Sequence, residues 1–186
     1  MKDNVMDTPL TKDQEKSLLQ LARQSITHYL EKGTPPDIEA DDEVFKQKRG
    51  AFVTVKVKDR LRGCIGYPIP YKSLFETITE AAISAATKDY RFASLEKKEL
   101  HVTKIEISVL SLPELVKDIS EIEVGKHGII ITKGHSRGLL LPQVPLEWGW
   151  DRETFLSHAC MKAGLEEDSW KKGAQIEIFS AQVFSE

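Results

Sequence analysis

The hexapeptide Leu61–Gly66, with the sequence LRGCIG, places the thiol of Cys64 between two glycines and close to an arginine. The residues before it alternate between apolar and polar types and predict a half-buried strand over 51–57. Residues 58–60 predict a polar turn, so the hexapeptide is expected to pair back as the second strand of a hairpin. Side chains two apart on a strand share a face, and Arg62 and Cys64 are therefore expected to be same-face neighbours.

This spacing would let a guanidinium approach the sulfur, because same-face neighbours on a strand lie about 6.5 Å apart. A nearby cation stabilises the thiolate, which is the nucleophilic form of cysteine. Cys64 and Arg62 are thus the candidate catalytic residues, and Gly63 and Gly66 are candidate binding positions where a substrate reaches the backbone. The alternative is an inert packing role for Cys64, because free cysteine is among the most buried residue types.

Helix caps indicate the elements around this hairpin. A capping box at Thr11 and apolar residues at helical spacing predict an amphipathic helix that Gly33 ends. Two prolines and four acidic residues make 34–42 a surface loop. A second capping box at Ser73 begins another helix, and Ser94 is expected to cap a short helix before residue 100.

The second half of the chain predicts further strands and one helix. Alternation at 104–110 predicts a strand, and the apolar runs at 128–132 and 138–141 predict a buried hairpin. Asp151 is expected to cap a helix in which Cys160 faces the core, and alternation at 176–178 predicts a last strand that closes the sheet. The chain is therefore expected to have an α+β fold, with helices packed on a mainly antiparallel sheet.

Two other patterns favour structural roles over chemistry. The loop 133–138 carries three potential cations and two glycines, which would suit an anion, but turns select such residues for backbone reasons alone. No metal site is predicted, because His158 and Cys160 lie two apart on a helix and neither cysteine belongs to a CxxC pair. The sequence also lacks phosphate-loop and dinucleotide-binding spacings.

Length and composition indicate a single domain over residues 1–186, as one compact body or as two closely packed lobes. The chain has 186 residues, of which 40% are hydrophobic, and a formal net charge of −3. A chain of this charge has no overall positive field to gather phosphates, so nucleic-acid binding is not expected. We expect no membrane association and a cytoplasmic location, because the sequence contains neither a long apolar run nor a signal core. Two cysteines are too few for a disulfide framework and are expected to be reduced.

The hexapeptide is one part of a longer pattern, which also includes the segments Asp89–Phe92, Lys104–Leu110, Gly138–Val144, Glu147–Trp148, Phe155–Leu156, Cys160–Leu165, Trp170 and Val183–Phe184. With this pattern, the chain resembles the AMMECR-one domain family, called AmmeMemoRadiSam system protein A in prokaryotes. The likeness runs from about Leu18 to Phe184 and departs from the family at Ala93, where members often carry proline.

The resemblance implies an α+β fold with two closely associated lobes, and it makes Asp89 and Arg91 a wall of the same site as Cys64. The alternative for these two residues is a local salt bridge or cap. Gln143 and Glu147 are further candidate binding residues, with Gln143 either facing the cleft or tying down backbone. A carboxylate such as Glu147 can act as a general base, although carboxylates beside tryptophans are more often structural anchors.

Two functions remain open. The prokaryotic relatives are grouped by gene neighbourhood with a Memo-like protein and a radical-SAM protein, so the resemblance implies a binding or accessory role in a shared modification pathway. The alternative is a thiol-dependent enzyme or group carrier in which Arg62 stabilises the Cys64 thiolate and Asp89 or Glu147 handles a proton. The sequence identifies no cofactor, substrate or oligomeric state.

Overall fold

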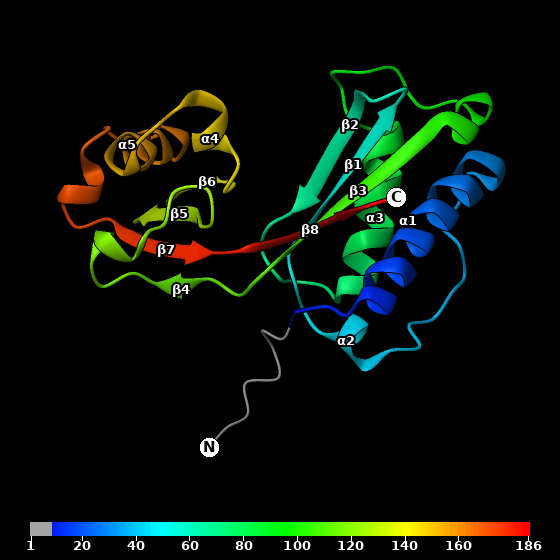
Figure 1. Ribbon diagram of the computed structural model, residues 1–186, viewed down its shortest axis with the longest axis horizontal. Helices are drawn as coiled ribbons and strands as arrows, with labels where there is room; N and C mark the ends of the chain where they lie inside the picture. Colours follow the sequence, from blue (N-terminus) through cyan, green and yellow to red (C-terminus); the bar gives the residue numbers. More distant parts are fainter. Residues whose placement is uncertain (1–8) are drawn as a thin grey trace. The chain divides into compact units, whose positions relative to one another are not determined.

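The computed structural model describes residues 9–186, and these residues form two compact units (Figure 1). The described residues up to Leu110, together with Gln182–Glu186, form the first unit, and Ser111–Ala181 form the second. The second unit is therefore inserted into the chain of the first. Each unit has its own four-stranded sheet and its own hydrophobic core.

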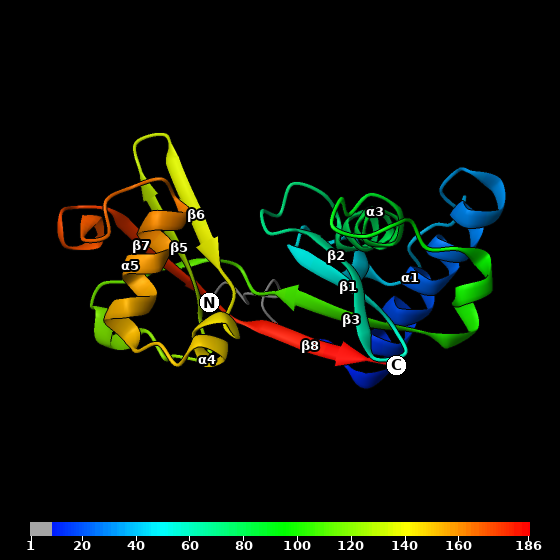
Figure 2. The same cartoon turned by 90° about the horizontal axis from the view of Figure 1, so that it is seen from above.

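The first sheet has the strand order β2-β1-β3-β8 (Figure 2). The predicted hairpin is present as β1 (Ala51–Val57) and β2 (Arg60–Tyr67), β3 (Thr103–Leu110) pairs antiparallel with β1, and β8 (Ala181–Ser185) completes the sheet. The hairpin turn contains only Lys58 and Asp59, with φ angles of 51° and 61°, because Arg60 already pairs with Val57. Positive φ at both central residues is typical of a type I′ turn.

Two long helices cover one face of this sheet. Both predicted capping boxes are present, at Thr11 before α1 (Lys12–Lys32) and at Ser73 before α3 (Leu74–Thr87), and Gly33 ends α1 with a φ of 76°. Apolar side chains of α1 and α3 form one core with the inward-facing residues of β1 and β3. A short helix that the sequence did not predict, α2 (Glu43–Lys46), follows the predicted loop.

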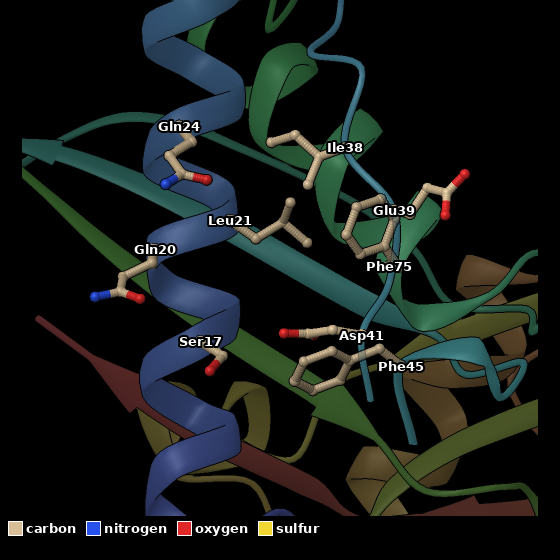
Figure 3. Close-up of a pocket in the computed structure, with 9 residues that line it drawn as sticks. All are labelled: Ser17, Gln20, Leu21, Gln24, Ile38, Glu39, Asp41, Phe45 and Phe75. Atoms are coloured by element: carbon tan, nitrogen blue, oxygen red, sulfur yellow. The ribbon is translucent and has the colours of Figure 1, made fainter. Parts of the chain in front are cut away.

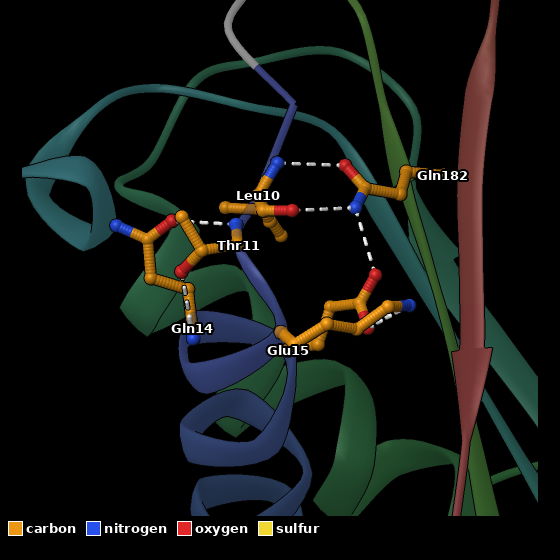
Figure 4. A network of polar contacts seen from close by, with 6 residues as sticks. Leu10, Thr11, Gln14, Glu15 and Gln182 are labelled. Carbon is orange, nitrogen blue, oxygen red and sulfur yellow. Dashed lines mark hydrogen bonds and ion pairs between the residues drawn. The ribbon is translucent and has the colours of Figure 1, made fainter.

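Gln182 of β8 is bound to the beginning of α1 (Figure 4). Its Oε1 accepts the N–H of Leu10 at 2.8 Å, and its Nε2 donates to the Leu10 carbonyl at 2.9 Å. The same Nε2 donates to Glu15 Oε1 at 2.8 Å. A side-chain amide thus makes both hydrogen bonds that a paired strand would make with Leu10, and it joins the two ends of the first unit.

The segment between α3 and β3 differs from the prediction. A 3₁₀ helix spans Lys97–Val102 and follows Glu96, whose N–H is accepted by Glu99 at 2.9 Å. The prediction that Ser94 caps this helix is wrong, because the residue three positions after Ser94 is a lysine that cannot accept a hydrogen bond. Glu96 has the glutamate partner that a capping box requires.

The second unit contains the predicted hairpin, β5 (Gly128–Lys133) and β6 (Ser136–Leu140), in a sheet of order β4-β7-β5-β6. The last predicted strand is β7 (Gln175–Phe179), and β4 (Glu114–Leu115) pairs with it. Helices α4 (Val144–Trp148) and α5 (Arg152–Lys162) follow β6, and Asp151 caps α5 as predicted. Short 3₁₀ helices span Ile119–Glu121 and Ser169–Lys171.

These units give the α+β fold that the sequence predicts, with one organisational difference. The sequence indicated one sheet closed by the strand at 176–178, whereas that strand joins the second sheet and β8 returns to the first. Within residues 9–186, no helix combines the length and the apolar character that crossing a bilayer requires.

Candidate functional site

Cys64 lies on the face of the first sheet that points away from α1 and α3. Thr54 is opposite Cys64 in the hairpin, and Glu106 of β3 is opposite Thr54. These three half-buried residues form a line across three strands, which we call the Cys64 row. The hydroxyl of Thr54 donates a hydrogen bond to Cys64 Sγ at 3.2 Å. The row therefore presents a thiol, a hydroxyl and a carboxylate side by side on neighbouring strands.

An ion pair and an aromatic ring flank the row. Lys56 Nζ lies 2.9 Å from Glu106 Oε2, and both side chains are about one-third exposed. On the other side, Phe52 is opposite Gly66, and its ring occupies the space above that glycine. The outer face of the sheet thus combines apolar, thiol and charged groups within a few residues.

Asp89 and Arg91 hold the outer edge of β2 at Cys64. Asp89 Oδ2 accepts the N–H of Cys64 at 2.9 Å, and Arg91 Nη2 donates to the Cys64 carbonyl at 3.5 Å. Two further hydrogen bonds, of 2.9 and 2.7 Å, join the Arg91 guanidinium to the Asp89 carboxylate. Together the two side chains make the contacts that another strand would make with this edge.

The charge state of Asp89 is fixed by these contacts. Asp89 is only 5% exposed. The Arg91 guanidinium holds the pKa of the Asp89 carboxyl well below its usual range, and the Cys64 and Arg91 N–H groups act in the same direction against the effect of burial. Asp89 is therefore an anion at neutral pH and is held in place by its donors.

Arg62 does not make the contact with the thiol that its spacing predicts. The strand register shifts between Val55 and Lys56 of β1, so that Arg62 is an extra residue in a β-bulge. Its guanidinium instead donates to the carbonyl oxygen atoms of Ala93 and Ser94, and Nη2 lies 3.3 Å from Glu99 Oε2. These partners, all from the segment 93–99, engage the guanidinium in place of the expected contact with the thiol.

The two glycines of the hexapeptide are closely packed on the side where a Cβ atom would lie. A Cβ atom on Gly63 would lie 1.8 Å from the carbonyl oxygen of Ala85, so Gly63 allows α3 to approach the backbone of β2 closely. A Cβ atom on Gly66 would lie 2.3 Å from the Phe52 ring. A helix and an aromatic ring therefore fill the space at these positions.

The remaining candidates lie in the second unit. Gln143 and Glu147 are both exposed, at the start and near the end of α4, and the Gln143 backbone carbonyl accepts the N–H of Glu147 at 3.1 Å. Cys160 is 0% exposed in the core, as predicted, and burial raises the pKa of its thiol. Both cysteines are free.

Sequence reasoning missed Thr54, Phe52 and Glu106 as neighbours of the thiol. The alternation over 51–57 places Ala51, Val53 and Val55 on one face, which leaves Phe52 and Thr54 on the other, and the signal for their contacts is the pairing register of the hairpin. Across residues 9–186, no group of three or more His, Cys, Asp or Glu side chains is arranged to hold a metal ion.

Comparisons with known proteins identify the family to which this chain is related. The AMMECR1 family model matches residues 19–184. The chain is similar to protein MK0488 of Methanopyrus kandleri, with 47% identity over 97% of this chain and 92% of that protein. It is also similar to protein MJ0810 of Methanocaldococcus jannaschii, with 45% identity over 95% of this chain and 92% of that protein.

A solved structure supports the same assignment. The crystal structure of uncharacterized protein PH0010 from Pyrococcus horikoshii matches with a TM-score of 0.84 and 39% sequence identity. The match covers 95% of this chain and 93% of that one. Sequence and fold agree along nearly the whole chain, and the chain belongs to the AMMECR1 family.

Proposed function

We propose that this protein is a binding, accessory component of a modification pathway shared with Memo-like and radical-SAM proteins, and that the Cys64 row is its contact surface. The observation that carries the proposal is the state of Asp89, the carboxylate in contact with Cys64. It already accepts hydrogen bonds from Arg91 and from the Cys64 backbone, and its pKa is lowered by them. Asp89 is therefore engaged as a structural anion.

An accessory role fits this geometry better than proton transfer does. A general base works best when its pKa lies near the working pH, and the pKa of Asp89 is shifted away from neutrality. Arg62, the other expected helper, is bound to Glu99 and to backbone carbonyl oxygen atoms. The charged groups around Cys64 thus hold the strand edge in a fixed shape, which favours recognition.

The groups of the outer face suit a partner protein. The Phe52 ring offers apolar contact area, and the Lys56–Glu106 pair offers one charge of each sign beside the thiol. Aromatic groups at the centre of a contact and charges around them are typical of protein interfaces. The rigid sheet would present these groups without an ordering cost.

The test is calorimetric titration of the full chain with purified Memo-like and radical-SAM proteins from the same genome. We expect one of them to bind, and Glu106→Arg to weaken that binding at least about tenfold, because it reverses a charge inside the contact surface. Glu167→Arg makes the same charge change at an exposed position of the second unit and is expected to leave binding unchanged. Absence of binding to either protein, or equal losses in both variants, would count against the proposal.

A thiol-dependent enzyme or group carrier is the second candidate. The observation in its favour is the Thr54 hydroxyl, which donates to Cys64 Sγ and would stabilise a thiolate there. The test is the pH dependence of iodoacetamide labelling of native protein, followed by peptide mass spectrometry with Cys160 as internal control. Fast labelling of Cys64 already at pH 7 would favour thiol chemistry, whereas labelling of neither cysteine before denaturation would exclude it.

A further inference from the structure

A groove runs along one side of α1, where the helix faces the chain segment 36–41. It consists of two adjoining hollows that share Gln24 and Ile38. The first hollow begins at Ser17 (Figure 3), and the second continues along the helix to Glu31. The stretch from Ser17 to Glu31 covers about 21 Å along the helix axis. An extended peptide of roughly six residues has the same length.

The first hollow has an apolar base and a polar rim. Leu21 of α1 and Phe45 of α2 are buried at its base, and Phe75 of α3 is half-buried beside them. Leu21 and Ile38 point toward each other across the hollow in Figure 3. Ile38 is 40% exposed, so an apolar side chain placed here would remove further hydrophobic surface from water.

Carboxylates line the groove along its length. Glu39 and Asp41 belong to the first hollow, and Glu31 and Asp37 belong to the second. All four are exposed, and within residues 9–186 none of their carboxylates makes a side-chain hydrogen bond or ion pair. The pKa of the Lys46 ammonium is raised mainly by Glu43 and to a smaller extent by Glu39, so Glu39 is the one carboxylate of the four with a cation nearby. The charges of these side chains are therefore largely available to a ligand.

The positive charge at the groove is already neutralised. Arg23 lines the second hollow together with the imidazole of His28. The Arg23 guanidinium donates to Glu186 Oε1 at 2.6 Å and to the Thr103 carbonyl at 2.7 Å. The groove consequently has a negative character that repels phosphate groups and attracts cations.

We propose that this groove binds an extended, positively charged segment of a partner protein. Lysine or arginine side chains of the segment lie against the carboxylates, and one apolar side chain occupies the hollow over Leu21 and Phe45. Complementary charge favours encounter and fixes the register of the bound segment, and the length of the groove suits a peptide better than a compact small molecule. The groove lies on the helical side of the first unit, so this inference goes beyond the proposed function of the Cys64 row.

The first experiment measures binding of a fluorescein-labelled hexapeptide of alternating lysine and leucine residues to the full chain by fluorescence anisotropy. We expect saturable binding that weakens as salt is raised from low to physiological ionic strength. A hexapeptide of alternating glutamate and leucine residues has the same apolar content and is expected not to bind. Failure of the cationic peptide to give saturable binding would overturn the proposal.

Variants then locate the site. Asp41→Lys and Glu39→Lys are each expected to weaken peptide binding several-fold, and Ile38→Ala is expected to weaken it without a change of charge. Glu167→Lys, at an exposed position outside the groove, makes the same charge change and serves as the matched control. Circular dichroism checks that each variant is folded. Equal weakening by the groove and control variants would mean unspecific electrostatic attraction and would also overturn the proposal.

Discussion

The backbone N–H of Cys64 donates to the carboxylate of Asp89 at 2.9 Å, although the two residues are 25 positions apart in the chain. Asp89 and Arg91 thereby take the place of a fifth strand beside β2, and they close an edge that would otherwise expose hydrogen-bonding groups. The segment after α3 is thus coupled directly to the strand that carries the thiol.

Asp89→Ala is expected to lower the free energy of unfolding by about 1–3 kcal/mol, because it leaves the Cys64 N–H and the Arg91 guanidinium without their buried acceptor. Urea denaturation followed by circular dichroism measures the loss. Glu166→Ala is the control, since the Glu166–Lys172 pair is exposed on the surface of the second unit and should matter little. Similar losses for the two variants would contradict the importance assigned to Asp89.

The stability contributed by Asp89 should depend on pH. Its pKa is lower in the folded protein than in the unfolded chain, where an aspartate titrates near ~3.9. The contribution is therefore present in full above the unfolded pKa and is lost as the pH falls below about 4 toward the folded pKa. Unfolding curves of wild type and Asp89→Asn between pH 6 and pH 2.5 should converge on acidification, and a constant difference would rule this linkage out.

Gly63→Ala should destabilise the first unit more than Gly66→Ala. The added methyl group at Gly63 would lie 1.8 Å from the backbone oxygen of Ala85, whereas at Gly66 it would lie 2.3 Å from the Phe52 ring and 2.5 Å from the backbone oxygen of Ala51. The overlap with backbone is deeper at Gly63, and relieving it requires α3 to shift as a whole, so we expect a loss above about 3 kcal/mol for Gly63→Ala. Thermal unfolding monitored by circular dichroism shows which variant loses more stability. A larger loss for Gly66→Ala than for Gly63→Ala would refute the close approach of α3.

Thr54→Val should slow alkylation of native Cys64 at neutral pH by roughly two- to tenfold, because the hydroxyl no longer donates to the sulfur. Thr54→Ser keeps the donor and should react like the wild type. Iodoacetamide labelling with mass-spectrometric quantification provides the rates, and Cys160 should stay unlabelled in all three proteins. Equal rates for the valine and serine variants would show that the hydrogen bond has no influence on reactivity.

The helix ends could be predicted from sequence because each cap is a local interaction. Thr11 and Ser73 exchange hydrogen bonds with residues three positions later, so the signal lies within four adjacent residues. The same logic identifies the Ser94 error, since Glu96 rather than Ser94 has an acceptor three positions on.

The neighbours of the thiol depend on the register of the hairpin, which local signals only partly fix. With the three-residue turn 58–60 that the sequence predicts, regular pairing would place Thr54 opposite Cys64. The hairpin instead has a two-residue turn and a bulge at Arg62, and these two one-residue shifts cancel, so Thr54 still lies opposite Cys64. Alternation of residue types does not reveal a bulge, and it gives no information on Asp89, which reaches β2 from beyond α3.

Because the second unit is inserted into the first, the last strand of the first unit is synthesised only after the whole second unit. Phe184 is buried in the core of the first unit, yet it is made only after all of Ser111–Ala181. While the ribosome is translating the second unit, the nascent first unit lacks β8 and the Gln182 contacts with Leu10 and Glu15. Domains generally fold as they emerge, N-terminal part first. Here the sheet and core of the first unit can be completed only after the second unit has been synthesised, because β8 follows that unit in the chain.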